Sequence, residues 1–82
     1  MTKKRYRFYN DIGVHNILSY ISPDQVISIR RMSIGEFVES LYDGTVFDLN
    51  SYENRFLRDK LEMERFHGIG IEDGILVIER KI

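Results

Sequence analysis

The stretch from Ile69 to Arg80, IGIEDGILVIER, constrains the fold more than any other part of the chain. At its centre, Asp73-Gly74 is a dipeptide favoured in two-residue type I′ turns, in which both central residues adopt positive φ. The turn predicts a β-hairpin that pairs Ile71 with Leu76 and Ile69 with Ile78. Side chains alternate along a strand, so these four apolar residues share one face of the hairpin. An isolated hairpin is only marginally stable in water, and we expect the other elements of the chain to cover that face.

Composition indicates one globular domain spanning residues 1–82. The chain is 43% hydrophobic and 30% charged and has no cysteine, which excludes disulfides and thiolate chemistry. A domain of this size buries a small core, and a deep catalytic pocket would take a large share of it. The sequence has no apolar run of membrane-spanning length, and its N-terminus MTKKRYRFYN lacks the apolar core of a signal peptide. We therefore expect a cytoplasmic protein that is not an enzyme and that neither uses a cofactor nor contacts a membrane.

The local patterns predict most of the secondary structure. Residues 4–9 alternate charged and aromatic side chains, which is typical of a strand, and residues 11–21 have the apolar spacing of a short helix with Asn10 or Asp11 as its cap. Residues 25–32, QVISIRRM, are rich in β-branched side chains and predict a strand. Residues 45–49, TVFDL, predict another strand. Asn50-Ser51 followed by Glu53 is a capping signature for a helix that continues to Leu57 or Leu61.

Residues 33–43 allow two interpretations. As a helix, Ser33 and Glu36 form a capping box, Ile34, Phe37 and Leu41 lie on one face, and Gly44 ends the element. As a strand, Phe37 and Leu41 alternate with Val38 and Tyr42, after a turn at Ile34-Gly35. Local rules favour the helix. The predicted fold class is thus α+β, with a small antiparallel sheet of four or five strands, a C-terminal β-hairpin and one to three short helices on one face.

No group of residues has the signature of a catalytic or metal site. The two histidines, His15 and His67, lie in no recognisable motif, and Glu64 with His67 supplies too few ligands for the metal sites that use such a pair. The stretch HGIGI resembles the start of a phosphate-binding loop but lacks its third glycine, its lysine and the following helix. Gly68 and Gly70 instead indicate a strand that another backbone approaches closely, or a bulge. We therefore expect no catalytic, cofactor-binding or metal-binding residues.

Charge is distributed unevenly along the chain. Residues 1–32 have six basic and two acidic side chains, a net of +4, whereas residues 33–82 have six basic and eleven acidic ones, a net of -5. Two candidate surfaces follow from this asymmetry. The first is an acidic face that would contact a basic partner protein, formed by Glu36, Glu39, Asp43, Asp48, Glu53 and Asp59. The second is a basic and aromatic face that would bind RNA or single-stranded nucleic acid, formed by Arg5, Tyr6, Arg7, Phe8, Arg30 and Arg31.

Two facts argue against nucleic-acid binding by the basic face. Alternation along a strand places only one of Arg30 and Arg31 on a given side of a sheet. The whole chain has a net charge of -1, while nucleic-acid-binding domains of this size usually carry a clear basic excess. Solvated surface charge explains each single residue of either face equally well.

Three pieces of the sequence, VISIRRM, LYDGTVFDLN and GIGIEDGILVIER, resemble in this order the small accessory proteins encoded by phages and prophages of Gram-positive bacteria. The resemblance covers roughly residues 12–80 and implies strands on both sides of residues 33–43, which favours the strand there. The chain departs from the pattern in its basic N-terminus and around residues 61–66. The resemblance implies no catalytic residues. It suggests a product that acts by binding a host or phage protein, including one of a defence or regulatory system.

The sequence therefore predicts a non-enzymatic protein-interaction module that modulates or inhibits a partner protein. One alternative is a regulator that binds RNA or single-stranded nucleic acid through the basic N-terminus. Another is a self-associating structural protein, a homodimer in which an open sheet edge pairs between two copies.

Overall fold

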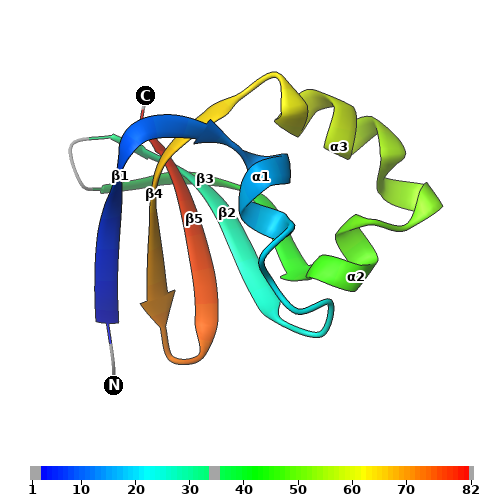
Figure 1. Ribbon diagram of the computed structural model, residues 1–82, viewed down its shortest axis with the longest axis horizontal. Coiled ribbons are helices and arrows are strands. Elements are labelled where there is room, and N and C mark those ends of the chain that lie inside the picture. Colours follow the sequence, from blue (N-terminus) through cyan, green and yellow to red (C-terminus); the bar gives the residue numbers. More distant parts are fainter. Residues whose placement is uncertain (1–2, 34–35, 82) are drawn as a thin grey trace.

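The computed structural model describes residues 3–33 and 36–81, which form one sheet flanked by short helices (Figure 1). In chain order the elements are β1 (Lys3–Gly13), α1 (Val14–Leu18), β2 (Val26–Ser33), β3 (Glu36–Thr45), α2 (Val46–Leu49), the 3-10 helix η1 (Tyr52–Asn54), α3 (Arg55–Glu62), β4 (Arg65–Glu72) and β5 (Ile75–Lys81). The arrangement is that of a small α+β domain. None of the described helices combines the length and the hydrophobicity of a membrane-spanning segment.

The described part of the chain forms a five-stranded sheet in the order β1-β4-β5-β2-β3. Three of the neighbouring pairs are antiparallel, but β2 and β5 run parallel at the centre of the sheet. The prediction of an antiparallel sheet is therefore wrong in this respect, and the sheet is mixed. No local signal marks the parallel pair, because the chain between β2 and β5 contains two strands and all of α2, η1 and α3.

The turn between β4 and β5 has the predicted geometry. Asp73 has a φ of 51° and Gly74 a φ of 83°, both in the left-handed region that a type I′ turn requires. The strands pair Ile71 with Leu76 and Ile69 with Ile78, as the turn predicts.

Residues 36–45 form the strand β3, so the helix that local rules favoured for residues 33–43 is wrong there; Ile34 and Gly35 lie outside the described residues. Pairing with β2 along its whole length outweighs the capping signature of Ser33 and Glu36. Two register shifts interrupt this pairing, after Ile29 and after Arg31.

Two other segments differ from their predictions, and both lie where a strand is followed by a helix. The strand predicted for residues 45–49 is a helix after its first residue, because the side chain of Thr45 accepts a hydrogen bond from the backbone N–H of Asp48 (3.1 Å) and caps α2. The helix predicted for residues 11–21 is shorter, since β1 continues to Gly13 and pairs Ile12 with Phe66. The predicted helix after Asn50-Ser51 is present, as η1 followed by α3 to Glu62.

The core lies between one face of the sheet and the helices. Its centre consists of Ile27 and Ile29 from β2 with Phe66 and Ile78 from β4 and β5, and all four are fully buried. The helices contribute Val14, Ile17, Val46, Leu49 and Leu61. The sheet face with these core residues is called the helix side here, and the opposite one the open face.

The helices cover the hairpin only in part. On its helix side, Ile78 is fully buried whereas Ile71, near the turn, is 39% exposed. The helices therefore do not extend over the end of the hairpin next to the turn, and the apolar side chains there remain accessible.

Candidate functional site

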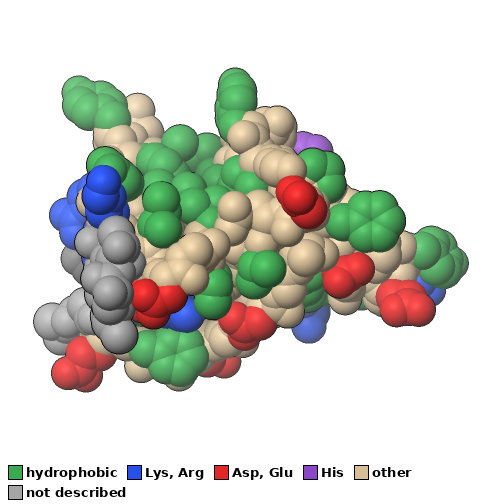
Figure 2. All heavy atoms as spheres, turned by 90° about the horizontal axis from the view of Figure 1, so that it is seen from below, with side chains coloured by type: hydrophobic (Ala, Val, Ile, Leu, Met, Phe, Trp, Pro, Cys, Tyr) green, Lys and Arg blue, Asp and Glu red, His purple; other side chains and the backbone are tan. Residues whose placement is uncertain are grey.

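An apolar groove lies on the helix side, between α1 and the strands β1, β4 and β5. It has a volume of about 400 Å³. Its lining residues are Phe8, Ile12, Asn16, Ile17, Tyr20, Ile21, Ile69 and Leu76. Figure 2 shows hydrophobic side chains gathered in a hollow between two projections at the upper edge of the view. Asn16 is the one lining residue with a hydrogen-bonding side chain other than the Tyr20 hydroxyl, so the groove suits apolar groups.

The two faces of β1 explain how the groove is built. Tyr6 lies opposite Ile69 and Arg7 opposite Gly68, so Tyr6 and Phe8 extend the apolar helix side while Arg5 and Arg7 lie on the open face. The chain then shifts register between Arg7 and Ile12, and Ile12 re-enters the same apolar surface. On the other wall, Ile17, Tyr20 and Ile21 come from α1 and the turn after it.

One exposed tyrosine, Tyr20, lines the groove, and two more, Tyr6 and Tyr9, lie within two positions of the lining residue Phe8 in the sequence. Tyr20 is 91% exposed and Tyr6 57% exposed, while Tyr9, next to the lining residue Phe8, is fully exposed. Tyrosine combines a large apolar ring with a polar hydroxyl and is enriched where proteins contact one another.

Acidic residues adjoin the lining in the sequence. Asp11 precedes Ile12, Asp24 follows Ile21, and Asp73 lies in the turn between β4 and β5. All three are exposed, and none forms an ion pair with the described residues. Lys4, opposite Ile71, is an exposed cation on the same side of the sheet. The residues close to the lining in the sequence are therefore more acidic than basic.

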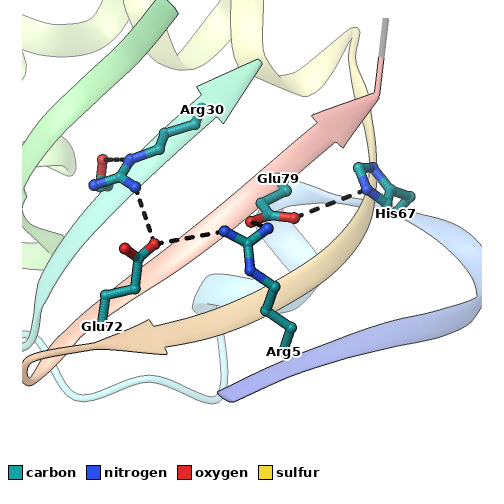
Figure 3. A network of polar contacts seen from close by, with 6 residues as sticks. Arg5, Arg30, His67, Glu72 and Glu79 are labelled. Carbon is teal, nitrogen blue, oxygen red and sulfur yellow. Dashed lines mark hydrogen bonds and ion pairs between the residues drawn. The ribbon is translucent and has the colours of Figure 1, made fainter. Parts of the chain in front are cut away.

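The open face has a different character, because a network of ion pairs crosses it (Figure 3). The network consists of Arg5 on β1, His67 and Glu72 on β4, Glu79 on β5, and Arg30 on β2. Arg5 Nη1 donates to Glu79 Oε1 at 2.6 Å, and Arg30 Nη1 donates to Glu72 Oε2 at 3.0 Å. His67 Nε2 lies 3.9 Å from Glu79 Oε2. Glu79 and Val77, two positions apart on the same face of β5, are buried although none of the described helices covers this face. We attribute their burial to the long side chains of the network.

Two glycines make the network possible. Arg5 on β1 reaches Glu79 on β5 across the intervening strand β4, where Gly68 and Gly70 have no side chains in the way. A Cβ atom at Gly68 would lie 2.9 Å from the carbonyl oxygen of Tyr6, and one at Gly70 would lie 3.0 Å from that of Lys4. The prediction that another backbone passes close to these glycines is confirmed, and that backbone is β1.

The residues proposed as a basic face are thus divided between several surroundings. Arg5 and Arg30 share the open face and are paired with Glu79 and Glu72. Arg31 is on a different side from Arg30, as alternation predicts, and bonds Glu39 at 2.7 Å. This hydrogen bond raises the pKa of Arg31 above its ordinary value. Of the aromatic members, Phe8 is partly buried against the core and Tyr6 points to the helix side.

The residues proposed as an acidic face are mostly exposed and come from consecutive elements. Asp43, Asp48 and Glu53 lie together around a shallow polar depression at the junction of β3, α2 and η1. Glu36 and Glu39 lie further back on β3, and Asp59 lies on α3. The structure therefore brings three of the six acids together.

Two groups of that region, Asp43 and Tyr42, have pKa values shifted by their surroundings. The hydroxyls of Ser28 and Ser40 donate to the carboxylate of Asp43 and lower its pKa, the Ser28 bond having the larger effect. Burial raises the pKa of Tyr42, and the charge of Asp48 adds to the shift. Neither change produces a nucleophile or a general base at neutral pH.

Neither histidine belongs to a metal-binding arrangement in the described part of the chain, because no three His, Asp or Glu side chains there lie close enough together to hold a metal ion. His15 is exposed beside Glu62 on α3, and His67 belongs to the open-face network.

Comparison with models of protein families, with curated proteins and with solved structures finds no match for this chain. Sequence reasoning missed the groove. Its one local signal is the helical spacing of Ile17, Tyr20 and Ile21, which indicates a shared face but not whether that face is covered.

Proposed function

We propose that this chain is a non-enzymatic protein-interaction module whose apolar groove receives an apolar segment of a partner protein. The observation that carries the proposal is the incomplete cover of the hairpin, which leaves Ile69, Leu76 and Ile71 beside an open groove instead of inside the core. A contiguous exposed apolar surface on a small domain usually marks a binding site. A groove with an aromatic rim and few polar groups fits the anchor side chains that dominate protein interfaces.

The charge around the groove defines the partner segment further. Asp11, Asp24 and Asp73 lie within three positions of lining residues in the sequence, are exposed and make no ion pair within the described residues, so lysine or arginine flanking the apolar segment would complement them. The acidic face formed by Glu36, Glu39, Asp43, Asp48, Glu53 and Asp59 would attract the same basic partner over a longer range. The partner is therefore a protein with an apolar segment between basic residues.

The resemblance to accessory proteins of phages supports a partner among host or phage proteins in the cytoplasm, with binding that modulates or inhibits that partner. A module of this kind acts by occupying a surface of its partner, and the apolar groove supplies the surface for that contact.

The test is a comparison of two exposed tyrosines in capture experiments. Wild type, Tyr20→Asp and Tyr52→Asp are each immobilised and exposed to nuclease-treated lysate of a Gram-positive host. Tyr20 lines the groove, whereas Tyr52 is 74% exposed on η1 and lines the polar depression beside Asp43, Asp48 and Glu53, where an added aspartate keeps the acidic character of that face. The proposal predicts one stoichiometric protein that wild type and Tyr52→Asp retain and Tyr20→Asp loses. Equal capture by all three proteins would contradict the groove as the binding surface.

Nucleic-acid binding is the second candidate, since Lys4, Tyr6 and Tyr9 are exposed on β1 together with Arg7. The ion pairs of Arg5 and Arg30 weaken it, because the network on the open face already neutralises those two charges. Binding to single-stranded RNA that weakens with salt and on Arg7→Ala would favour this candidate over the first.

A further inference from the structure

The two edges of the sheet carry opposite charge. In the described strand order, β1 and β3 are the outer strands, and each has one side without a strand partner. An edge strand exposes backbone N–H and C=O groups that another strand can pair with. From Lys4 to Tyr9, β1 has three basic residues and no acid: Lys4, Arg5 and Arg7. Arg5 is paired with Glu79 and Glu72 on the open face, so Lys4 and Arg7 supply the unpaired charge of this edge in the described residues, and one acid, Asp11, follows near the end of the strand.

From Glu36 to Thr45, β3 has three acids and no base: Glu36, Glu39 and Asp43. Glu39 is paired with Arg31 and Asp43 accepts hydrogen bonds from Ser28 and Ser40, so Glu36 is the acid of this edge without an ion pair or hydrogen bond among the described residues.

This distribution discriminates between the possible edge pairings. Two copies of β1 side by side would oppose basic residues, and two copies of β3 would oppose acidic ones, and like charges across a strand pair are destabilising. Pairing of β1 with β3 opposes unlike charges. We propose that copies of this chain associate by adding β3 of one copy to β1 of another, as an extension of the same sheet. This contact uses the backbone edge of β1, whose Phe8 and Ile12 side chains line the groove, and it does not depend on the proposed function.

The direction of the strands permits this extension. β1, β5 and β2 run one way, and β4 and β3 run the other way. When a second copy continues the sheet with its helices on the same side, its β3 is antiparallel to β1, as in the other outer pairs. The exposed rings of Tyr6 and Phe37, on β1 and β3, add apolar surface at the two edges.

The strand geometry also limits the strength of the contact. β1 pairs regularly with β4 only from Lys3 to Arg7, and β3 has two register shifts against β2. The regular part of each edge is therefore short, and such irregular edges resist extended pairing. The association is consequently weak and reversible. Because the two surfaces differ, it is a head-to-tail contact that produces rings or chains of copies instead of a symmetric dimer.

The experiment is sedimentation velocity over a concentration series up to about 1 mM at low salt. It compares wild type with Arg7→Glu and Glu36→Lys. Neither side chain forms an ion pair in residues 3–33 and 36–81, so both variants keep the fold, which circular dichroism verifies. The groove variant Tyr20→Asp serves as the matched control.

The proposal predicts that wild type and Tyr20→Asp increase in average mass with concentration and that either charge reversal weakens the association about tenfold. A mixture of the two reversed variants brings the new carboxylate at position 7 together with the new ammonium group at position 36 at one contact. The other contact in the mixture keeps the wild-type pair of charges, so association returns. A wild type that stays monomeric throughout the series would overturn the proposal. So would two folded variants that associate like wild type, or a mixture that stays monomeric.

Discussion

Substitution of Gly68 by alanine tests the close approach of β1 to β4, on which the whole open face depends. The added Cβ would lie 2.9 Å from the carbonyl oxygen of Tyr6, and both atoms belong to paired strands. One of the two strands must therefore shift by a few tenths of an ångström. Overpacking of this kind costs about 1–3 kcal/mol. Alanine also lowers the conformational entropy of the unfolded chain, which offsets about 0.4–1 kcal/mol.

The expected net effect is a loss of about 1–2 kcal/mol in the free energy of unfolding. For a domain of this size, such a loss lowers the melting temperature by about 4–16 °C. Urea unfolding followed by circular dichroism measures it as a lower midpoint with an unchanged slope.

Gly13 provides the control, because a Cβ there lies 3.7 Å from the end of the flexible Arg65 side chain and its φ is -69°. In Gly13→Ala the entropy gain and the weaker helix cap roughly cancel, and stability stays within about 0.5 kcal/mol of wild type. A Gly68→Ala variant as stable as Gly13→Ala would refute the close approach of the two strands.

Three other contacts can be tested by substitution in the same way. Glu79→Gln weakens the bond from Arg5 across β4, and we expect a loss of about 1.5–3 kcal/mol in urea unfolding, whereas an unchanged midpoint would contradict the network. Because the lowered pKa of Asp43 means that its ionised form stabilises the fold above about pH 4, that contribution is lost as the pH falls through the folded-state pKa. Between about pH 5 and pH 2, the free energy of unfolding should then decline less steeply for Asp43→Asn than for wild type, and parallel curves would refute the assignment. Thr45→Ala removes the cap of α2 and costs about 1 kcal/mol, while Thr45→Ser keeps it, so equal stability of these two variants would disprove the cap.

The hairpin shows what the sequence determines locally. Asp73-Gly74 fixes a turn of two residues, and the turn fixes the register of every pair that follows it, including Ile71 with Leu76. Gly68 and Gly70 are a second case, because glycine within a strand predicts that another backbone passes closely, even though the sequence does not identify that backbone as β1.

The errors lie where tertiary pairing competes with a local signal. Ser33 and Glu36 suggest a capped helix, but β2 offers β3 a partner along its whole length, and the strand forms. At residues 45–49 the reverse happens: β-branched side chains suggest a strand, while the Thr45 hydroxyl starts a helix. The parallel pair of β2 and β5 depends on the path of the intervening chain, and no local pattern reports it.

In the candidate site, too, some features follow from the local sequence and others only from tertiary packing. Alternation in residues 4–9 predicts that Tyr6 and Phe8 lie on one side of β1 and Arg5 and Arg7 on the other, as observed. The groove depends on how far α1 extends over the hairpin, which is a property of the packed helices. The pairing of Arg5 with Glu79, 74 positions away, likewise appears only when the strands are in place.

Hydrogen–deuterium exchange of the chain, alone and in complex with the partner captured through the groove, tests whether the groove is the binding surface. We expect slower exchange on partner binding in α1 and the turn to Ile21, in β1 around Phe8 and Ile12, and in the adjoining part of β4. Unchanged exchange in these segments, with protection confined to β3, α2 and η1, would contradict the groove and assign binding to the acidic face instead.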